Sequence, residues 1–260
     1  MKHKVERISK DLANRLSKWE QVDAITILES AEEDYISPYF FISLDVYYKG
    51  EIPDTETRRA LFSDAGAFES STYGKKDRFF IDDVPVRIEF KNLDRINTII
   101  ELTADNFGAF RASGTYMFFR LLTGKVLIQK NLWLDHIRKK LTQLPDDFWG
   151  MLATASLATM EHYLIDLQSA SMENDNYFYT VSLSGFLKTL CSLVFIINHE
   201  FEPSRRNILE KLENLSTLPE HFMGRFQSLL QQDEEMTNER KSDVAELLAK
   251  SIIPFIKVDY

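Results

Sequence analysis

The chain has 260 residues, enough for one large domain or two modest ones. Hydrophobic residues make up 44% and charged residues 27%, which excludes disordered, collagen-like and rod-like coiled-coil chains. Nine Gly and seven Pro argue against a turn-rich architecture of many hairpins. The single cysteine, Cys191, excludes an internal disulfide and a cysteine-based zinc site, and it suits a reducing cytoplasm. We expect Cys191 to be a buried core thiol, because it lies in an apolar helical run.

The formal net charge is -9, and the acidity is uneven. Residues 1–130 carry 21 acidic and 19 basic side chains, whereas residues 131–260 carry 19 and 12. This balance offers no basic face for duplex nucleic acid and favours a small-molecule or protein partner. The longest apolar runs, LCSLVFII and SIIPFI, are too short to span a bilayer. The charged N-terminus is not typical of a secretory signal, so we expect a cytoplasmic protein without a membrane partner.

The first half of the chain mixes helical and strand periodicity. Apolar residues spaced three and four apart predict an amphipathic helix over residues 5–20. Short apolar or alternating stretches predict strands at 24–28, 41–48, 77–90 and 124–128, with a hairpin turn at Asp82-Asp83 and a helix at 92–101. A polar, helix-like stretch separates the second strand from the third.

The strand signal ends near Leu132, and five helical segments joined by short connections follow. Proline marks the start of three of them, at Pro145, Pro203 and Pro219. The sequence therefore predicts an α+β protein: a mixed sheet with flanking helices over residues 1–130, and an all-α helical bundle over residues 131–260. We expect a cleft between these two domains.

Two carboxylates lie on the polar faces of two predicted strands. Asp45 alternates with Leu44 and Val46, and Glu89 alternates with Ile88 and Phe90. If the strands are neighbours, both carboxylates can converge from the exposed faces of the sheet on one Mg²⁺ ion, which prefers oxygen ligands. The alternative is that each carboxylate is simply solvated on a half-exposed strand.

The order of these elements resembles the nucleotidyltransferase superfamily, of the kanamycin and lincosamide type. The corresponding stretches are ILES at 27–30, SLD at 43–45 and RIE at 87–89, where the family has a Gly-Ser turn, Asp-x-Asp and a third acid. Two positions depart from that pattern: Glu29 replaces the Gly, and Ser43 replaces the first Asp. Glu29 would add bulk and negative charge beside a triphosphate, and Ser43 offers a hydroxyl in place of a metal-ligating carboxylate.

The resemblance implies Mg²⁺-dependent transfer of a nucleoside monophosphate from an NTP to a hydroxyl of a small molecule or protein. Asp45 and Glu89 would be the catalytic metal ligands, Ser30 and Ser43 would face the nucleotide, and Asp34 or Glu33 could supply the missing ligand. The departures leave an alternative open, in which the fold is kept without catalysis and serves as a nucleotide-sensing or protein-binding module.

Two further groups are candidates for a functional role. Arg205 and Arg206 precede a predicted helix, a position that favours anions, so they could contact the NTP phosphates; otherwise they belong to a solvated helix face. His162 and Asp166 lie four residues apart on one helix and could be a base with its orienting acid, or a surface hydrogen bond.

Overall fold

The computed structural model describes residues 2–28, 40–71, 73–101, 115–232 and 235–256. The chain divides into two compact units, described separately below. The sheet unit comprises Met1–Asn106 and Arg120–Gln143, and the helical unit comprises Phe107–Phe119 and Leu144–Tyr260.

The sheet unit is built on a six-stranded sheet in the order β3-β4-β5-β2-β1-β6. The β2–β5 pair is parallel and the other pairs are antiparallel, so the sheet is mixed as predicted. The strands are β1 (Val22–Ile27), β2 (Ile42–Tyr48), β3 (Gly66–Ser70), β4 (Lys76–Ile81), β5 (Val84–Asn92) and β6 (Lys125–Gln129).

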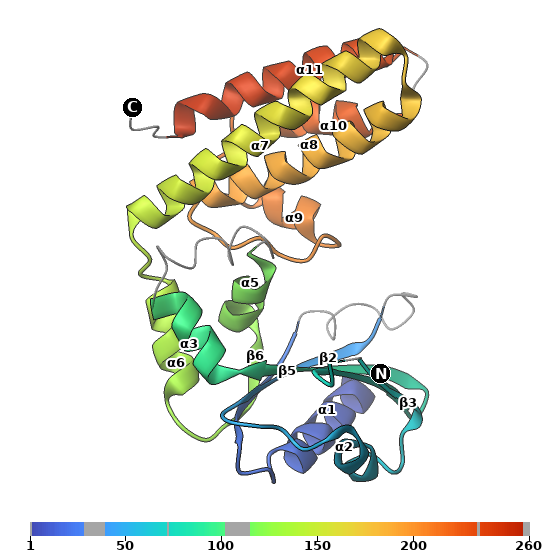
Figure 1. The fold of residues 1–260 in the computed structure, drawn as a ribbon, viewed down its shortest axis with the longest axis vertical. Helices are drawn as coiled ribbons and strands as arrows, with labels where there is room; N and C mark the ends of the chain where they lie inside the picture. Colours follow the sequence, from blue (N-terminus) through green and yellow to red (C-terminus); the bar gives the residue numbers. More distant parts are fainter. Residues whose placement is uncertain (1, 29–39, 72, 102–114, 233–234, 257–260) are drawn as a thin grey trace. The chain divides into compact units, whose positions relative to one another are not determined.

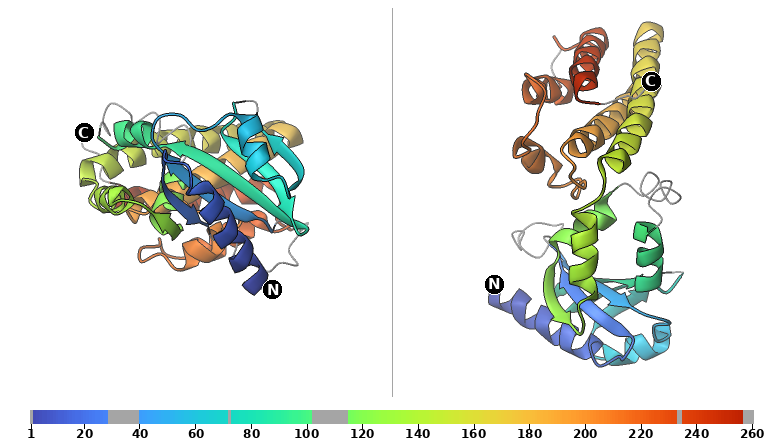
Figure 2. Two further views of the ribbon diagram at one scale, coloured as in Figure 1. Left: turned by 90° about the horizontal axis from the view of Figure 1, so that it is seen from below. Right: turned by 90° about the vertical axis from the view of Figure 1, so that its left-hand side faces the viewer.

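Helices cover both faces of this sheet (Figure 1). One face carries α1 (Lys2–Leu16) and α2 (Thr55–Leu61), and the other carries α3 (Leu93–Glu101), α6 (Trp133–Leu141) and the end of α5 (Tyr116–Thr123). The apolar stripe of α1 is buried against the apolar residues of β2, as its periodicity predicts. Both faces of β2 are therefore buried, along the whole strand. The two further views in Figure 2 show the helices on either side of the sheet.

The predicted hairpin at Asp82-Asp83 is confirmed between β4 and β5. Asp82 and Asp83 have φ of 48° and 63°, the left-handed values that a tight two-residue hairpin turn requires. The edge strand β3 was not expected, because its residues are mostly exposed and show no clear alternation. This strand forms because it pairs with β4, and the hydrophobic pattern of its own residues does not indicate it.

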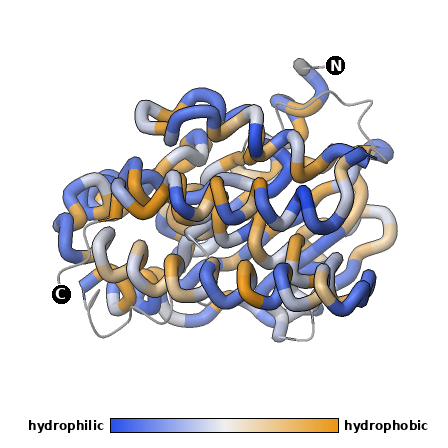
Figure 3. The backbone as a smooth tube through the Cα atoms, turned by 90° about the horizontal axis from the view of Figure 1, so that it is seen from above, coloured by the Kyte–Doolittle hydropathy of each residue, from blue (hydrophilic) through white to orange (hydrophobic). Residues whose placement is uncertain are grey.

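In the helical unit, the described residues form helices joined by turns. The longest helix, α7, begins at Asp146 directly after Pro145 and ends at Glu173, where the following Asn174 has a left-handed φ of 56°. Hydrophobic and hydrophilic residues alternate around the helical turns (Figure 3). The helices are α7 (Asp146–Glu173), α8 (Asn176–Ile197), α9 (Ile208–Glu213), α10 (Phe222–Leu230) and α11 (Asn238–Ile252), followed by the 3-10 turn η2 (Ile253–Phe255).

The apolar run LCSLVFII forms the end of α8, a helix of 22 residues with a mean hydropathy of 1.8 over its most apolar window. By length and composition it could cross a membrane, contrary to the expectation from the short run alone. The core helix of a bundle has the same properties, and α8 packs along α7. Its buried side chains include Phe186, Leu190, Leu193 and Val194.

Candidate functional site

The parallel pairing of β2 with β5 brings the two candidate carboxylates together. Asp45 is the register partner of Glu89, with Ser43 opposite Arg87. Register partners on adjacent strands point to the same face of a sheet. The expectation that Asp45 and Glu89 lie side by side on one face is therefore confirmed.

The expectation that this face is exposed is wrong for Asp45, whose side chain has no exposed surface. The cause is the helical layer over this face, because Tyr47 is fully buried there with its ring 5.5 Å from the ring of Trp133 in α6. Glu89 keeps 16% of its side chain exposed. The site is thus a buried carboxylate beside a partly exposed one, and not an open pair.

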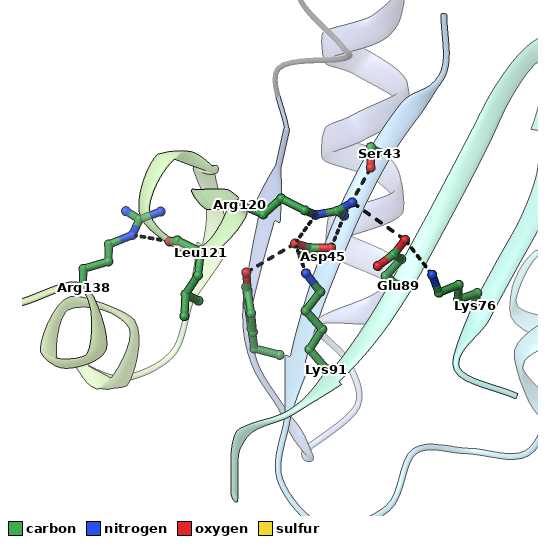
Figure 4. A network of polar contacts seen from close by, with 9 residues as sticks. Ser43, Asp45, Lys76, Glu89, Lys91, Arg120, Leu121 and Arg138 are labelled. Atoms are coloured by element: carbon green, nitrogen blue, oxygen red, sulfur yellow. Dashed lines mark hydrogen bonds and ion pairs between the residues drawn. The ribbon is translucent and has the colours of Figure 1, made fainter. Parts of the chain in front are cut away.

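Arg120, on α5, neutralises Asp45 directly. Its Nε donates to Asp45 Oδ2 at 3.0 Å, and its Nη2 donates to Asp45 Oδ1. The same Nη2 lies 3.4 Å from the hydroxyl of Ser43. The fork of one guanidinium thus contacts both Ser43 and Asp45 of the SLD stretch (Figure 4).

A second cation completes the pairing of Asp45. Lys91 Nζ donates to Oδ2 at 2.7 Å, and the Tyr47 hydroxyl lies 3.4 Å from the same oxygen. Burial alone would raise the pKa of Asp45, but the charges of Lys91 and Arg120 outweigh it and hold the pKa below its usual value. Asp45 is therefore ionised and fully occupied by internal partners.

Glu89 is also paired with basic side chains. Lys76 Nζ lies 3.2 Å from Oε1, and Arg120 Nη1 lies 3.7 Å from the same oxygen. Together, Asp45 and Glu89 form what we call the acidic pair, and it is matched by three cations, Lys76, Lys91 and Arg120. The cluster as a whole carries one excess positive charge.

Two features fix the end of α5 and hence Arg120. Arg138 of α6 donates to the carbonyl oxygens of Leu121 and Gly124, which lie at the C-terminal end of the helix. A Cβ on Gly124 would lie 2.8 Å from the Arg120 carbonyl oxygen and 2.9 Å from Thr26 Oγ1. Only glycine lets α5 end this close to β1.

The residues of this cluster do not fit Mg²⁺. Its candidate oxygen ligands are two carboxylates and one serine hydroxyl, and each carboxylate is already paired with basic side chains. In the part of the chain that the structure describes, no group of three or more Asp, Glu, His or Cys side chains could hold a metal ion. A divalent cation would compete with a guanidinium that cannot lose its charge.

The other predicted residues lie elsewhere. Ser30, Asp34, Glu29 and Glu33 fall outside the described residues. Arg205 and Arg206 are exposed in the helical unit, in a turn before α9 whose N-terminal flanking residue is Asn207. They lie just before the helix, as the sequence suggests, because α9 begins at Ile208.

The remaining candidates behave as surface and core residues. His162 Nε2 lies 3.5 Å from Asp166 Oδ2, and 73% of the histidine side chain is exposed, which matches the surface reading of the pair. Cys191 is buried, and burial raises the pKa of its thiol to about 12, as expected for a core cysteine.

The basic partners of Asp45 were not singled out from the sequence. Lys91 could have been found, because it lies two residues after Glu89 on the same alternating strand. Arg120 had no such signal. It directly follows the apolar residues Tyr-Met-Phe-Phe at 116–119, a pattern typical of core packing, and 75 residues separate it from Asp45.

Comparison with known proteins gives a fold but no activity. The model of a domain of unknown function (DUF4037) matches residues 113–206. No curated protein matches the chain. Among solved structures, the crystal structure of a nucleotidyltransferase-like protein from Exiguobacterium sibiricum 255-15 is similar, with a TM-score of 0.51 and 12% identity over 96% of this chain and 74% of that chain. The chain therefore has an α+β, nucleotidyltransferase-like fold, with a mixed sheet and C-terminal helices.

Proposed function

We propose that this chain is a non-catalytic protein of nucleotidyltransferase-like fold that acts by binding a partner. The observation that carries the proposal is the double contact of Arg120 with Asp45, reinforced by Lys91. A carboxylate that ligates a catalytic metal needs free lone pairs, and the oxygens of Asp45 are committed to internal cations.

Of the two binding roles, protein binding is better supported than nucleotide sensing. A triphosphate is bound by cations that are free to face it. Lys91 and Arg120 are largely buried, and both already contact Asp45. The excess of one positive charge in the cluster is small against the charge of an NTP.

The second candidate is the Mg²⁺-dependent transfer of a nucleoside monophosphate from an NTP to a small-molecule or protein hydroxyl. One observation favours it: Asp45 and Glu89 occupy paired positions on one face, as the nucleotidyltransferase resemblance requires. It would need Arg120 to leave Asp45. Ser30, Arg205 and Arg206 would then be the proposed contacts of the nucleotide, and Asp34 the additional metal ligand.

Incubation with labelled ATP, GTP, CTP and UTP and a panel of acceptors tests the proposal. We expect no labelled product from the parent. The matched variant is Glu89→Gln, which removes the charge of the less buried carboxylate and should leave the protein folded. Asp45→Ala serves as the second variant. Transfer by the parent that Glu89→Gln abolishes would overturn the proposal and establish the second candidate.

A further inference from the structure

The outward face of the β4–β5 hairpin carries an arginine from each strand. On β4, Lys76, Arg78 and Phe80 alternate with buried residues, and all three are exposed. On β5, Arg87 is the register partner of Arg78. Register partners on antiparallel strands have their Cβ atoms about 4.5–5.5 Å apart on the same face of a sheet. The strand pairing therefore holds two guanidinium-bearing side chains next to each other.

This arginine pair is unfavourable without an anion. Like charges in directly opposite positions on paired strands destabilise a sheet. The Arg87 guanidinium carbon lies 4.2 Å from the centroid of the Phe41 ring, a contact that stabilises a cation but adds no negative charge. In the part of the chain that the structure describes, the side chain of Arg78 forms no hydrogen bond or ion pair. The donors of Arg78 are therefore available to an external anion.

The face as a whole is positively charged when every strand is counted. Lys76, Lys91 and Arg120 are already matched to the acidic pair. Among the described residues of the face, only Glu69 on β3, the other register partner of Arg78, is set against the two arginines. The basic residues of the face are Lys76, Arg78, Arg87, Lys91 and Arg120, and the acidic ones are Asp45, Glu69 and Glu89.

The spacing of these groups fits an extended acidic segment. Alternate residues of an antiparallel strand are about 6.8 Å apart, so Lys76, Arg78 and Phe80 form a row of two cations and one apolar side chain. Lys76 approaches Glu89 (Figure 4), but its side chain is 52% exposed and its ammonium has three donors. Pro85, the register partner of Phe80, widens the apolar end. An extended peptide repeats at the same distance, and guanidinium groups bind carboxylates in a two-bond geometry.

A nucleic-acid strand fits this face less well. It would carry a continuous run of phosphates past Glu69 and Glu89, which lie on the face, and past Asp82 and Asp83 at the hairpin turn. Proteins that bind single strands offer a basic groove that follows the backbone. A peptide can instead place its carboxylates at the arginines and its neutral residues beside these acids.

We propose that the β4–β5 surface, formed by Lys76, Arg78, Phe80, Pro85 and Arg87, is the docking site for an extended acidic segment of a protein partner. One carboxylate of the segment binds Arg78 and Arg87, a second binds Lys76, and an apolar side chain packs on Phe80. This inference rests on the partner-binding role proposed above, but the two fail separately. Nucleotidyl transfer by the parent would overturn that role, whereas peptide binding tests the surface.

The test uses the full chain and a fluorescein-labelled peptide with glutamate, glutamate and phenylalanine at alternate positions and threonine between them. Fluorescence anisotropy at low ionic strength should give a Kd on the order of 10 μM. Arg78→Gln should weaken binding at least about fivefold, because it removes one guanidinium of the pair. The variant should remain folded with an unfolding temperature no lower than that of the parent, since the change removes a like-charge contact.

The matched control is Arg59→Gln. Arg59 is exposed on α2, which covers the opposite face of the sheet, so the variant has the same net charge as Arg78→Gln. Its affinity for the peptide should differ from that of the parent by less than about twofold. An equal loss of affinity in the two variants would overturn the proposal, because the peptide would then respond to net charge alone.

Two control peptides test the alternate spacing. A peptide of the same composition with its glutamates adjacent directs them to opposite sides of an extended chain, and a second peptide has glutamine in place of glutamate. Each should bind at least about fivefold more weakly. Equal binding of the first control, no binding of the designed peptide, or unchanged binding by Arg78→Gln would overturn the proposal. Tighter binding of a uridine oligonucleotide that Arg78→Gln abolishes would also overturn it, since the occupant would then be a nucleic acid.

Discussion

Arg120 and Asp45, 75 residues apart in the chain, are joined by two hydrogen bonds from one guanidinium to one carboxylate. The contact holds a permanent positive charge beside Asp45, the carboxylate that the nucleotidyltransferase resemblance implies is a metal ligand. Arginine keeps its proton at all physiological pH values, and its planar fork matches a carboxylate. The pair therefore stabilises the buried site internally, and it removes the negative charge that would attract Mg²⁺.

Asp45→Asn should destabilise the fold strongly. The change leaves Lys91 and Arg120 buried without their charged partner, and breaking a buried ion pair from one side costs about 3–5 kcal/mol. Urea unfolding at pH 7 measures this loss. The control is Asp64→Asn, which breaks an exposed pair with Arg15 and should cost less than about 1 kcal/mol.

The cost of Asp45→Asn should depend on pH in one direction. The pKa of Asp45 is held below its usual value, so its stabilising effect is complete above the unfolded pKa of about 3.9 and is lost as the pH falls through the folded pKa. The free energies of unfolding of parent and variant should therefore converge on acidification from pH 7 toward pH 2. A constant difference across this range would contradict the assignment of Asp45 as an ionised partner.

Gly124→Ala should displace the end of α5 and with it Arg120. Its Cβ would lie within 3.0 Å of three atoms of Arg120 and Thr26, and overpacking of this kind costs about 1–3 kcal/mol. Thermal unfolding is the measurement. Gly150→Ala on α7 meets nothing within 4 Å and should instead stabilise by about 0.5–1 kcal/mol. Equal changes in the unfolding temperature of the two variants would contradict the inference that Gly124 is needed where α5 ends close to β1.

The fold was largely predictable from local pattern. The periodicity of α1, the alternation of β2 and the turn at Asp82-Asp83 each identify their element, because burial of one face or a tight turn selects particular residues. The edge strand β3 was not predictable, since its exposed residues carry little pattern. The segment after β6, with α6, packs with the sheet unit, which no local feature of residues 131–143 indicates.

The site was predictable only in part. Alternation and the motif order identified Asp45 and Glu89 as neighbours, because each feature can be recognised within one strand. Whether Asp45 is neutralised depends on Arg120, a residue that lies far beyond β5 in the sequence and contacts Asp45 only in the folded chain. An ion pair between residues this far apart in the sequence has no effect on local periodicity. The burial and the neutralisation of Asp45 therefore became visible only in the structure.

Cys191 should be unreactive in the native protein. Burial raises the pKa of its thiol to about 12, so the thiolate is scarce at pH 8 and the reagent is excluded. Reaction with a disulfide reagent should follow global unfolding and become fast in urea. A Ser184→Cys variant, exposed on the same helix, should add one rapidly reacting thiol. Fast native labelling of the parent would contradict the packing of α8.

Glu202→Gln should make the protein more stable relative to the parent as the pH rises. Burial raises the pKa of Glu202, despite the hydrogen bond from Ser192 at 2.8 Å, so native Glu202 retains its proton above the unfolded pKa of about 4.3. Ionisation above that pH therefore lowers the stability of the parent but not of the variant. Urea unfolding at pH 4 and pH 7 tests the sign, with the exposed Glu220→Gln as a control that should change little. If Glu202→Gln instead lost stability relative to the parent between pH 4 and pH 7, the raised pKa of Glu202 would be contradicted.

The most direct measurement is Mg²⁺-dependent NTP binding by calorimetry for the parent and for the double variant Ser43→Asp/Arg120→Gln. In the double variant the guanidinium is gone and a third carboxylate lies beside Asp45 and Glu89, so we expect it to bind Mg²⁺ with the nucleotide at millimolar concentration. Ser43→Asp alone should gain nothing, because its carboxylate would pair with Arg120, 3.4 Å from the native hydroxyl. For the parent we expect no Mg²⁺-dependent binding. Binding by the parent that Glu89→Gln abolishes would contradict a metal-free, non-catalytic site.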